Sequence, residues 1–448
     1  MFSVGQAVSP PPGAELVRSD PVTPRLRPAA RTRRALIASA RAVFEEQGYS
    51  DTRIEHITAR AGYAIGTYYT HFSGKEEVFR HVLDDMLAAV PMPNQGNDVR
   101  GTTDAGSASD LLARLERANI RYWRSFPSHR RLWTVFEEAT LMEEDARSMV
   151  EARWSTYRSL QVQKFECWKS EGLIPSGLDI GRTIEPLAAM TDWLVALQRV
   201  YRHKYPIPVR AEMLTSIWAL ALGLDASLIG EPPARREPRQ PTERGAERVA
   251  AAVRLGTKAE GTRREIVESA RQVFSARGLA ETGIRDIVAG ADVSVGTFYR
   301  YFDSKEQVLE AILRSLGETI RPQEPDGGVR ASIEVSNRKY LTEVASNPAL
   351  WRAIAKTVLT HRPLQAALSA RRNEHVTLTA TAIARWQRHG AVSAPLEPLV
   401  AAATLIAMTE RSAHNWYVID DHPPRLDIAV ADVSELWCRV LRPTDSTP

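Results

Sequence analysis

The apolar positions of the chain recur at intervals of three and four residues, which is the spacing of one face of an α-helix. Apolar residues from Leu36 to Phe44 follow this spacing, and Gly48 stands where a helix often ends in the left-handed conformation. The pattern returns from Ile266 to Phe274 and is again followed by a glycine, Gly278. No notable segment alternates apolar and polar residues as a half-buried strand would. The pattern therefore predicts an all-α protein.

Short helices are expected to follow the first helix of each region. The apolar spacing predicts a second helix over residues 54–61 and a third over residues 65–72. A capping box, in which two side chains each bond the backbone of the other residue, predicts the start of a fourth helix. The pairs that form it are Ser73 with Glu76 and, further along the chain, Asp303 with Glu306.

The chain contains an internal repeat. Residues 32–83 align with residues 262–313 without a gap, and roughly 22 of 52 positions are identical. A fainter similarity continues beyond this region: "RRLWTVF" at Arg130 resembles "PALWRAI" at Pro348, and "LAAMTDW" at Leu187 resembles "LIAMTER" at Leu405. The sequence therefore predicts two tandem copies of one helical unit of roughly two hundred residues.

The segment between the copies combines prolines and mixed charge with few apolar residues, which is typical of a linker. The first thirty residues are also rich in proline and lack the apolar core of a signal peptide. The predicted organisation is a disordered arm (1–30), a first domain of short helices (31–90), a first domain of longer helices (108–229), a linker (230–259), a second domain of short helices (260–320) and a second domain of longer helices (330–442).

The composition is that of an ordinary globular protein. Of 448 residues, 44% are hydrophobic and 25% are charged, and the net charge of +4 is compatible with nucleic acid without requiring it. Cys167 and Cys438 have no pairing or ligand spacing, which suits a reducing compartment. No apolar run reaches the length of about 18 residues that a membrane span needs. We therefore expect a cytoplasmic protein with no membrane partner.

The motifs of common enzymes are missing from the sequence. It has no phosphate-binding glycine loop, no HExxH and no nucleophile elbow, and its ten histidines are scattered. The cysteines occupy non-equivalent places in the two copies, which argues against a shared nucleophile. We expect no enzymatic activity, no catalytic residues, no metal site and no cofactor.

A short helix, a tight turn and a second short helix form a helix-turn-helix, whose second helix enters the DNA major groove. The turns are "AGYAIG" in the first copy and "ADVSVG" in the second. The first turn position commonly takes a positive φ, which suits Gly62 and which Asp292 tolerates at some cost. Gly66 and Gly296 leave the front of the recognition helix bare, so the backbone can approach the duplex closely.

Both copies resemble the DNA-binding domain of the TetR/AcrR family of transcriptional regulators. The stretches "GTYYTHFSGKEEVF" and "GTFYRYFDSKEQVL" carry the signature glycine, aromatic residues and lysine at fixed offsets, over about 50 residues in each copy. The resemblance implies a bacterial, nucleoid-associated DNA-binding regulator, most simply a repressor that a small apolar ligand releases from double-stranded operator DNA. It also implies dimerisation through the last two long helices of each unit, near residues 180–203 with 209–228 and 395–419 with 426–441.

The predicted DNA contacts lie in and around the recognition helices. Three side chains of each copy are expected to contact phosphate. They are the threonine near the N-terminus of the recognition helix, Tyr69 or Tyr299 in that helix, and the lysine at the start of the next helix. Phe72 and Phe302 are expected in the core. The candidates in the first copy are Arg53, Ala64, Ile65, Gly66, Thr67, Tyr69, Thr70, His71 and Lys75. Those in the second copy are Ser294, Val295, Gly296, Thr297, Tyr299, Arg300, Tyr301 and Lys305.

Aromatic residues in the later helices are candidates for a ligand pocket, although residues of this kind at helical spacing also form ordinary core. In the first copy they are Trp123, Phe126, Trp133, Phe136, Trp154, Tyr157 and Trp168. In the second copy they are Trp351, His361, His375 and Trp386.

Two alternatives stay open at this point. The protein is either a regulator or a ligand-binding or scaffold protein whose helix-turn-helix units have lost specific DNA binding, with the first copy, which has Glu55 and His71, the first to have lost it. The units pair either within one chain, as an intramolecular pseudo-dimer with an asymmetric operator, or with their counterparts in a second chain, as a homodimer with four DNA-binding domains.

Overall fold

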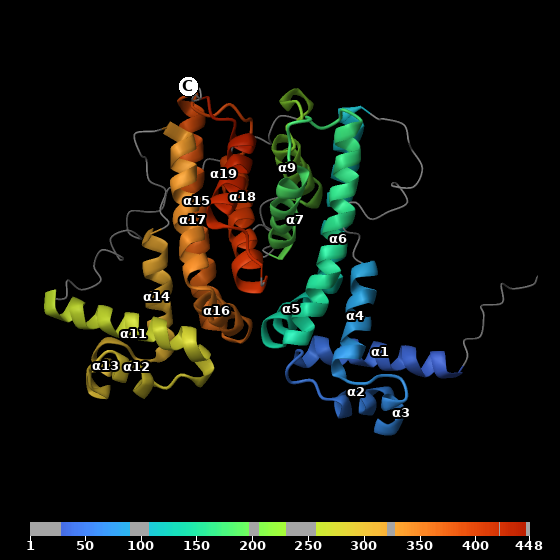
Figure 1. Cartoon of the computed structure of the whole chain (residues 1–448), viewed down its shortest axis with the longest axis vertical. Coiled ribbons are helices and arrows are strands. Elements are labelled where there is room, and N and C mark those ends of the chain that lie inside the picture. Colours follow the sequence, from blue (N-terminus) through green and yellow to red (C-terminus); the bar gives the residue numbers. More distant parts are fainter. Residues whose placement is uncertain are drawn as a thin grey trace, which may run out of the picture.

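Helices form the regular structure of the described part of the chain (Figure 1). The computed structural model describes residues 28–89, 107–196, 206–229, 257–319, 328–420 and 422–444. Across these ranges, extended backbone pairing is limited to an isolated bridge between Val392 and Pro443. The all-α class that the apolar spacing predicts is confirmed.

Each unit begins with four helices that carry the helix-turn-helix. In the first unit they are α1 (Pro28–Gln47), α2 (Ile54–Ala61), α3 (Ile65–Tyr69) and α4 (Lys75–Ala89). In the second unit they are α11 (Thr257–Glu281), α12 (Ile284–Gly290), α13 (Val295–Tyr301) and α14 (Lys305–Thr319). Helix α1 thus begins within the segment that was expected to be disordered through residue 30. Figure 1 shows these two groups at the same end of the molecule, on opposite sides.

Longer helices follow in each unit. The first unit continues with α5 (Ala108–Met142), α6 (Glu144–Ser170), α7 (Ile180–Ala196), α9 (Ile207–Ala221) and the short 3-10 helix η2 (Ala226–Leu228). The second continues with α15 (Gly328–Ser346), α16 (Pro348–Thr360), α17 (Arg362–Arg388), α18 (Pro398–His414), a π-helical turn η3 (Asn415–Ile419) and α19 (Leu426–Leu441). Helix α5 is continuous where its counterpart is divided into α15 and α16 at Asn347 and Pro348.

The left-handed glycines agree with the prediction, and the capping boxes do not. Gly48 follows α1 with a φ of 86°, and Gly278 has a φ of 78° at a kink within α11. The side chain of Glu77, and not that of Glu76, accepts from the backbone N–H of Ser73 at 2.7 Å. Gln307 likewise replaces Glu306 as the partner of Asp303. Helices α4 and α14 begin at lysine, one residue later than the predicted box requires, so the third helical position falls on the next residue.

A matching set of buried hydrogen bonds extends the repeat into the later helices. In the first unit Nε1 of Trp218 donates to the hydroxyl of Thr191 at 3.0 Å, and Nδ2 of Asn119 donates to Thr215 at 2.9 Å. In the second unit Trp437 donates to Thr409 at 3.0 Å and Asn337 to Ser434 at 3.2 Å. Equivalent residues hold the same helices together in both units, with Ser434 in the place of Thr215. The faint sequence similarity outside the helix-turn-helix therefore reflects one shared fold.

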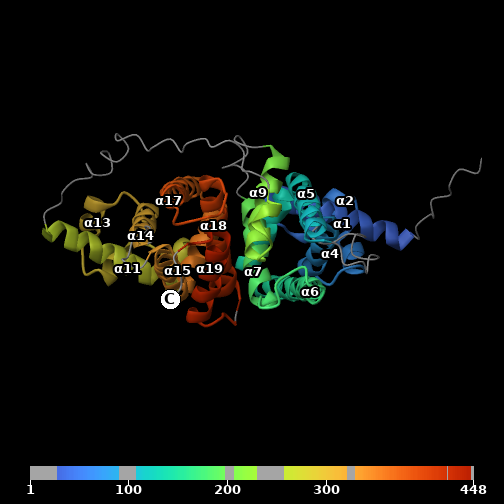
Figure 2. The same ribbon diagram turned by 90° about the horizontal axis from the view of Figure 1, so that it is seen from above.

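The two units meet along their last long helices. Helix α7 packs against α18, and α9 packs against α19, so these four helices form a bundle between the units (Figure 2). The bundle is apolar over most of its length, and α18 is buried almost throughout from Pro398 to Ala413. An ion pair joins α7 to α19, where Nε of Arg182 donates to Oδ2 of Asp432 at 3.0 Å. The bundle is thus built from unlike partners on one polypeptide.

Candidate nucleic-acid interface

The turn of each helix-turn-helix contains one residue in the left-handed conformation. Gly62 ends α2 with a φ of 72°, and Asp292 occupies the equivalent position with a φ of 51°. Glycine adopts this conformation freely, whereas aspartate is among the few other residues that tolerate it. The turn geometry predicted from the sequence is confirmed in both copies.

A buried aromatic ring fixes each recognition helix to its domain. Tyr68 in α3 and Phe298 in α13 are fully buried, and the phenol of Tyr68 donates to the carbonyl oxygen of Gly74 at 2.9 Å. Phe72 and Phe302 are also buried, as predicted. An arginine of the first helix lies over each of these two rings, Arg33 over Phe72 and Arg263 over Phe302, with 5.1 Å from guanidinium carbon to ring centre in both. The sequence did not predict either of these arginine–ring contacts.

The opposite face of each recognition helix points to solvent. Tyr69 and Tyr299 are 56% and 54% exposed, and Ile65 and Val295 are also exposed. Large apolar and aromatic side chains on a small domain are usually buried, so their exposure marks a contact surface. The other exposed candidates are Arg53, Ala64, Gly66, Thr70, Ser294, Gly296 and Arg300, whereas Thr67, His71, Lys75, Thr297, Tyr301 and Lys305 are half-buried. Whether each of these residues contacts DNA stays a prediction.

The two recognition helices differ at their first turn and at their tip. Ser294 caps α13, and its hydroxyl accepts from the backbone N–H of Thr297 at 3.0 Å. Ala64 takes this place in α3 and provides no side-chain cap. Arg300 is exposed, while the equivalent Thr70 donates its hydroxyl to the carbonyl oxygen of Thr67 at 2.7 Å. The second copy therefore presents a capped helix with the exposed guanidinium of Arg300. The first copy presents at the same position the short side chain of Thr70, which is bonded to its own helix.

The fold itself does not require glycine at Gly66 or Gly296. Neither has a positive φ, and a Cβ added at Gly66 would meet nothing within 4 Å. At Gly296 it would make ordinary contact with the Ser294 hydroxyl at 3.7 Å. Glycine within a helix destabilises it by roughly 0.5–1 kcal/mol relative to alanine. The bare surface is therefore best explained by the close approach of another molecule.

The two lysines predicted to contact phosphate also make bonds within the domain. Nζ of Lys75 donates to the carbonyl oxygen of Tyr49 at 3.1 Å and lies 4.2 Å from the centre of its ring. Nζ of Lys305 donates to the carbonyl oxygens of Leu279 at 2.6 Å and of Thr282 at 2.9 Å. Each lysine thus holds the part of the chain that leads from the end of the first helix to the second helix. A phosphate contact by either residue stays a prediction.

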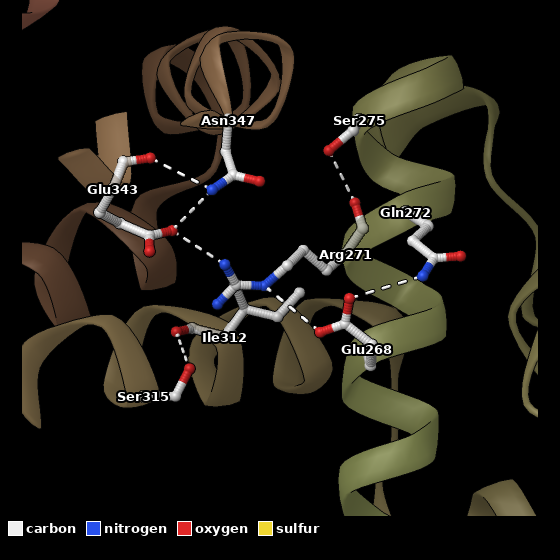
Figure 3. Close-up of polar contacts among 8 residues, drawn as sticks. All are labelled: Glu268, Arg271, Gln272, Ser275, Ile312, Ser315, Glu343 and Asn347. Atoms are coloured by element: carbon white, nitrogen blue, oxygen red, sulfur yellow. Dashed lines mark hydrogen bonds and ion pairs between the residues drawn. The ribbon is translucent and has the colours of Figure 1, made fainter. Parts of the chain in front are cut away.

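Glutamates attach each DNA-binding domain to the longer helices, and sequence analysis missed both. Glu138 of α5 accepts from the backbone N–H groups of Tyr49 and Ser50, both at 3.0 Å. In the second unit, Glu343 of α15 accepts from Nη1 of Arg271 at 2.8 Å and from Nδ2 of Asn347 at 3.1 Å (Figure 3). These contacts, which we call the first and second tethers, join residues far apart in the sequence.

The residues predicted to line a ligand pocket are distributed through the core of the longer helices. Trp123, Trp133, Phe136 and Trp168 are buried, and Trp351, His361, His375 and Trp386 are half-buried. His361 has a structural role, because its Nδ1 accepts from the backbone N–H of Leu364 at the start of α17. The side chains of Phe126, Trp154 and Tyr157 lie outside the described part of the chain. A ligand contact by any of these residues stays a prediction.

The described residues lack two further kinds of feature. Among them, no helix has the combination of length and apolar character that a membrane crossing needs. Nor do their histidine, cysteine, aspartate and glutamate side chains form a group of three or more suited to a metal ion.

A short helix, a left-handed turn residue and a second helix with an exposed outer face define a helix-turn-helix DNA-binding domain, and this chain carries two. The family described as "Bacterial regulatory proteins, tetR family" matches the chain at residues 36–82 and again at residues 266–312. The chain therefore carries, in tandem, two DNA-binding domains that are similar to those of TetR-family transcriptional regulators.

Several proteins of known name are similar to parts of this chain. The transcriptional regulator EthR of Mycolicibacterium smegmatis is 25% identical over 198 residues, which are 41% of this chain and 88% of EthR. The regulator TtgR of Pseudomonas putida is 39% identical over 66 residues, only 31% of its own length and 15% of this chain. Among solved structures, GusR of Salmonella enterica aligns over 41% of this chain and 96% of its own, with 23% identity and a TM-score of 0.35.

Proposed function

We propose that the chain is a repressor that binds an asymmetric operator with both of its helix-turn-helix domains, and that a small, largely apolar ligand releases it. The two units act together as an intramolecular pseudo-dimer, with α7 and α9 of the first unit against α18 and α19 of the second. Ligand binding favours an arrangement in which the recognition helices no longer fit successive major grooves, which lie about 34–36 Å apart.

The proposal is carried by the unlike faces of the bundle between the units. Trp193 and Arg411 occupy equivalent positions, the last residue of "LAAMTDW" and of "LIAMTER". They meet in the bundle, with the guanidinium carbon of Arg411 5.4 Å from the centre of the Trp193 ring. Because Trp193 and Arg411 occupy equivalent positions and contact each other, a two-fold axis that relates the two units would pass between them. Two second units paired with each other would place Arg411 against Arg411, which like charges disfavour.

The charged side chains around Trp193 and Arg411 find suitable partners only when a first unit pairs with a second unit. Nη1 of Arg411 lies 3.0 Å from Oε1 of Glu137 on α5 of the first unit. Oε2 of Glu410 accepts from Nε1 of Trp193 at 3.2 Å. The position equivalent to Glu137 in the second unit is Ala355, which could not pair with an arginine. These contacts support pairing of a first unit with a second unit over pairing of identical units.

Differences between the recognition helices support an operator with unlike half-sites. Arg300 can donate two hydrogen bonds to guanine, and Thr70 at the equivalent position cannot. The exposed rings of Tyr69 and Tyr299 and the bare glycines supply a similar backbone-contacting frame in both copies. We expect the two copies to share their phosphate contacts and to differ in the bases that they prefer.

Light scattering and site selection test the proposal together. A mass near 49.8 kDa at micromolar concentration, with selected sites that contain two unlike half-sites, is the expected result. A stable mass of about twice that value with a palindromic site would contradict the pseudo-dimer. Binding that depends steeply on salt and shows no sequence preference would instead support a scaffold that has lost specific recognition.

A further inference from the structure

Two consecutive glutamates of α5 contact different parts of the molecule. Oε1 of Glu137 lies 3.0 Å from Nη1 of Arg411, which belongs to α18 of the second unit. The carboxylate of Glu138 accepts from the backbone N–H groups of Tyr49 and Ser50 in the first DNA-binding domain, both at 3.0 Å. Successive residues of an α-helix point about 100° apart, so one turn can contact two neighbours at once. One turn of α5 thus joins the second unit to the first DNA-binding domain.

The helices around this turn pack in the same order. Helix α5 packs against α16 of the second unit, and against α1 and α4 of the first DNA-binding domain (Figure 1). Oε2 of Glu138 would lie 2.6 Å from a Cβ added at Gly48, so the carboxylate lies directly against the chain there. The side chains of Arg411 and Glu137 are only 12% and 23% exposed. Salt screens such a pair less than it screens a pair at the surface.

The pairing of the units fixes the position of Arg411. Its guanidinium carbon lies 5.4 Å from the centre of the Trp193 ring on α7 of the first unit. Nε1 of Trp193 donates to Oε2 of Glu410, the residue before Arg411, at 3.2 Å. Nε of Arg372 on α17 donates to the same oxygen at 2.7 Å. A change in the packing of α7 against α18 would therefore displace Arg411 and the carboxylate of Glu137 that it binds.

The second unit has different side chains at the equivalent positions. Ala355 corresponds to Glu137, and Lys356 corresponds to Glu138. Neither an alanine nor a lysine side chain can accept a hydrogen bond from a guanidinium or from a backbone N–H group. The two contacts that α5 makes therefore have no counterpart at these positions of α16.

The division between α15 and α16 also separates the second tether from these positions. Glu343 holds Arg271 from α15, whereas the positions equivalent to the two glutamates lie on α16. Asn347 and Pro348 stand between the two helices, while α5 is continuous from Ala108 to Met142. A displacement of α18 can therefore reach the first DNA-binding domain through one continuous helix, and the second domain lacks the same path through α16.

We propose that the ion pair of Arg411 with Glu137 is a positioning contact, through which the second unit sets the orientation of the first DNA-binding domain. The second domain takes its orientation from its own unit, through the second tether. The inference rests on the proposed function, because it needs a first unit that pairs with a second unit. A change at the interface between the units then acts first on α3. Because coupling is reciprocal, binding of the first domain to its half-site in turn stabilises the pairing of the units.

Hydrogen exchange of the full-length chain tests the contact, with the backbone N–H groups of Tyr49 and Ser50 as reporters. Glu137→Gln removes the charge that Arg411 binds and leaves Glu138 in place. This variant should speed exchange at the reporters about fivefold, although the bonds of the reporters are to Glu138. Arg411→Met should have the same effect from the other unit. Exchange in α11, α12 and α13 should be unchanged in both variants.

A matched control and the second domain separate positioning from a general loss of stability. Glu116→Gln changes another half-buried glutamate of α5 and should leave exchange at Tyr49 and Ser50 unchanged. Global unfolding would speed exchange in both DNA-binding domains alike. Equal acceleration in the two domains, or acceleration confined to α5 and α18, would therefore contradict the proposal.

The spacing of the half-sites gives a readout that a purely structural role would not change. Both domains must reach successive major grooves, so two extra base pairs between the half-sites should weaken binding of the unmodified chain about tenfold. In Glu137→Gln the loss should fall to about threefold, because the first domain is oriented less firmly. Glu116→Gln should keep the full loss. A full loss in Glu137→Gln would overturn the proposal.

Light scattering on the same samples separates this inference from the proposed function. Unchanged exchange at Tyr49 and Ser50 in a protein of mass near 49.8 kDa would contradict the positioning contact and leave the pseudo-dimer standing. Unchanged exchange at twice that mass would contradict both, because identical units paired between chains would not bring Arg411 to Glu137. The expected result is faster exchange at the reporters alone, with a reduced effect of half-site spacing.

Discussion

The first DNA-binding domain is held through its backbone, whereas the second is held through a side chain. In the first tether, Glu138 of α5 bonds the two amide groups that follow Gly48. In the second tether, Glu343 bonds Arg271 in the middle of the first helix. The residues at the equivalent positions of the other unit differ. Lys356 occupies the position of Glu138 in the second unit. Arg41, the counterpart of Arg271 in the first unit, pairs with Glu45 of its own helix at 3.0 Å.

The comparison shows that duplicated domains can keep one fold while exchanging the contacts that position it. The first tether also constrains Gly48, since a Cβ at that position would lie 2.6 Å from Oε2 of Glu138. The second tether depends on the division between α15 and α16, where Asn347 holds the carboxylate that Arg271 binds. Each DNA-binding domain therefore contacts the longer helices of its own unit through a different residue, and we expect the two contacts to be separable by substitution.

The largest expected effect is on the pairing of the units. Arg411→Glu would place a carboxylate beside Glu137 and should lower the free energy of unfolding by about 3 kcal/mol, as for loss of a mostly buried ion pair. The double variant Arg411→Glu with Glu137→Arg should recover most of that loss. Denaturant unfolding measures both. Additive losses in the double variant would show that the pair does not hold the units together.

Replacing the glutamate of one tether should lower the stability of only the DNA-binding domain that this glutamate contacts. Glu343→Gln should lower the local stability of α11 to α13 by about 2 kcal/mol and leave α1 to α3 unchanged, because a charge-assisted bond becomes a neutral one. Glu138→Gln should do the reverse. Hydrogen exchange read peptide by peptide distinguishes the domains, and equal loss in both domains for either variant would refute independent coupling.

A substitution in the second recognition helix should change the sequence specificity of DNA binding more than the matched substitution in the first. Arg300→Ala should reduce discrimination at one base position by about 1–3 kcal/mol, because an exposed guanidinium that can bond guanine is lost. Thr70→Ala is the matched change in the first copy and should have less effect, since that hydroxyl is bonded to Thr67. Site selection on both variants provides the measurement. A larger change with Thr70→Ala would reverse our assignment of the two helices.

The smallest expected effect is a loss of DNA affinity that is not accompanied by a loss of stability. Gly66→Ala and Gly296→Ala should each weaken DNA binding by about tenfold, or 1.4 kcal/mol, through a methyl group at the surface of the recognition helix. Both should keep or slightly raise the melting temperature, because alanine favours the helix. Gly48→Ala is the contrasting control and should lower it, given its φ of 86°. Unchanged DNA affinity in the first two variants would remove the argument for close backbone approach.

The parts of this molecule that depend on neighbouring residues could be predicted from the sequence. Spacing within the helices, the glycines at helix ends and the turn residue Asp292 all follow from local backbone preferences. The capping boxes were wrong by one residue, because the exact start of a helix is set by small differences in local bonding. The tethers could not be predicted, since Glu138 and Tyr49 are 89 residues apart and no local pattern marks the contact.

The bundle of α7, α9, α18 and α19 has a consequence for how the protein responds to its own abundance. A repressor assembled from two chains loses its paired form on dilution, so its occupancy of DNA falls more steeply than its concentration. In the proposed pseudo-dimer the paired helices belong to one polypeptide, so their association would not depend on how many chains are present. Occupancy of an operator by this protein should therefore follow the first power of its concentration, so that even a few copies per cell remain fully assembled.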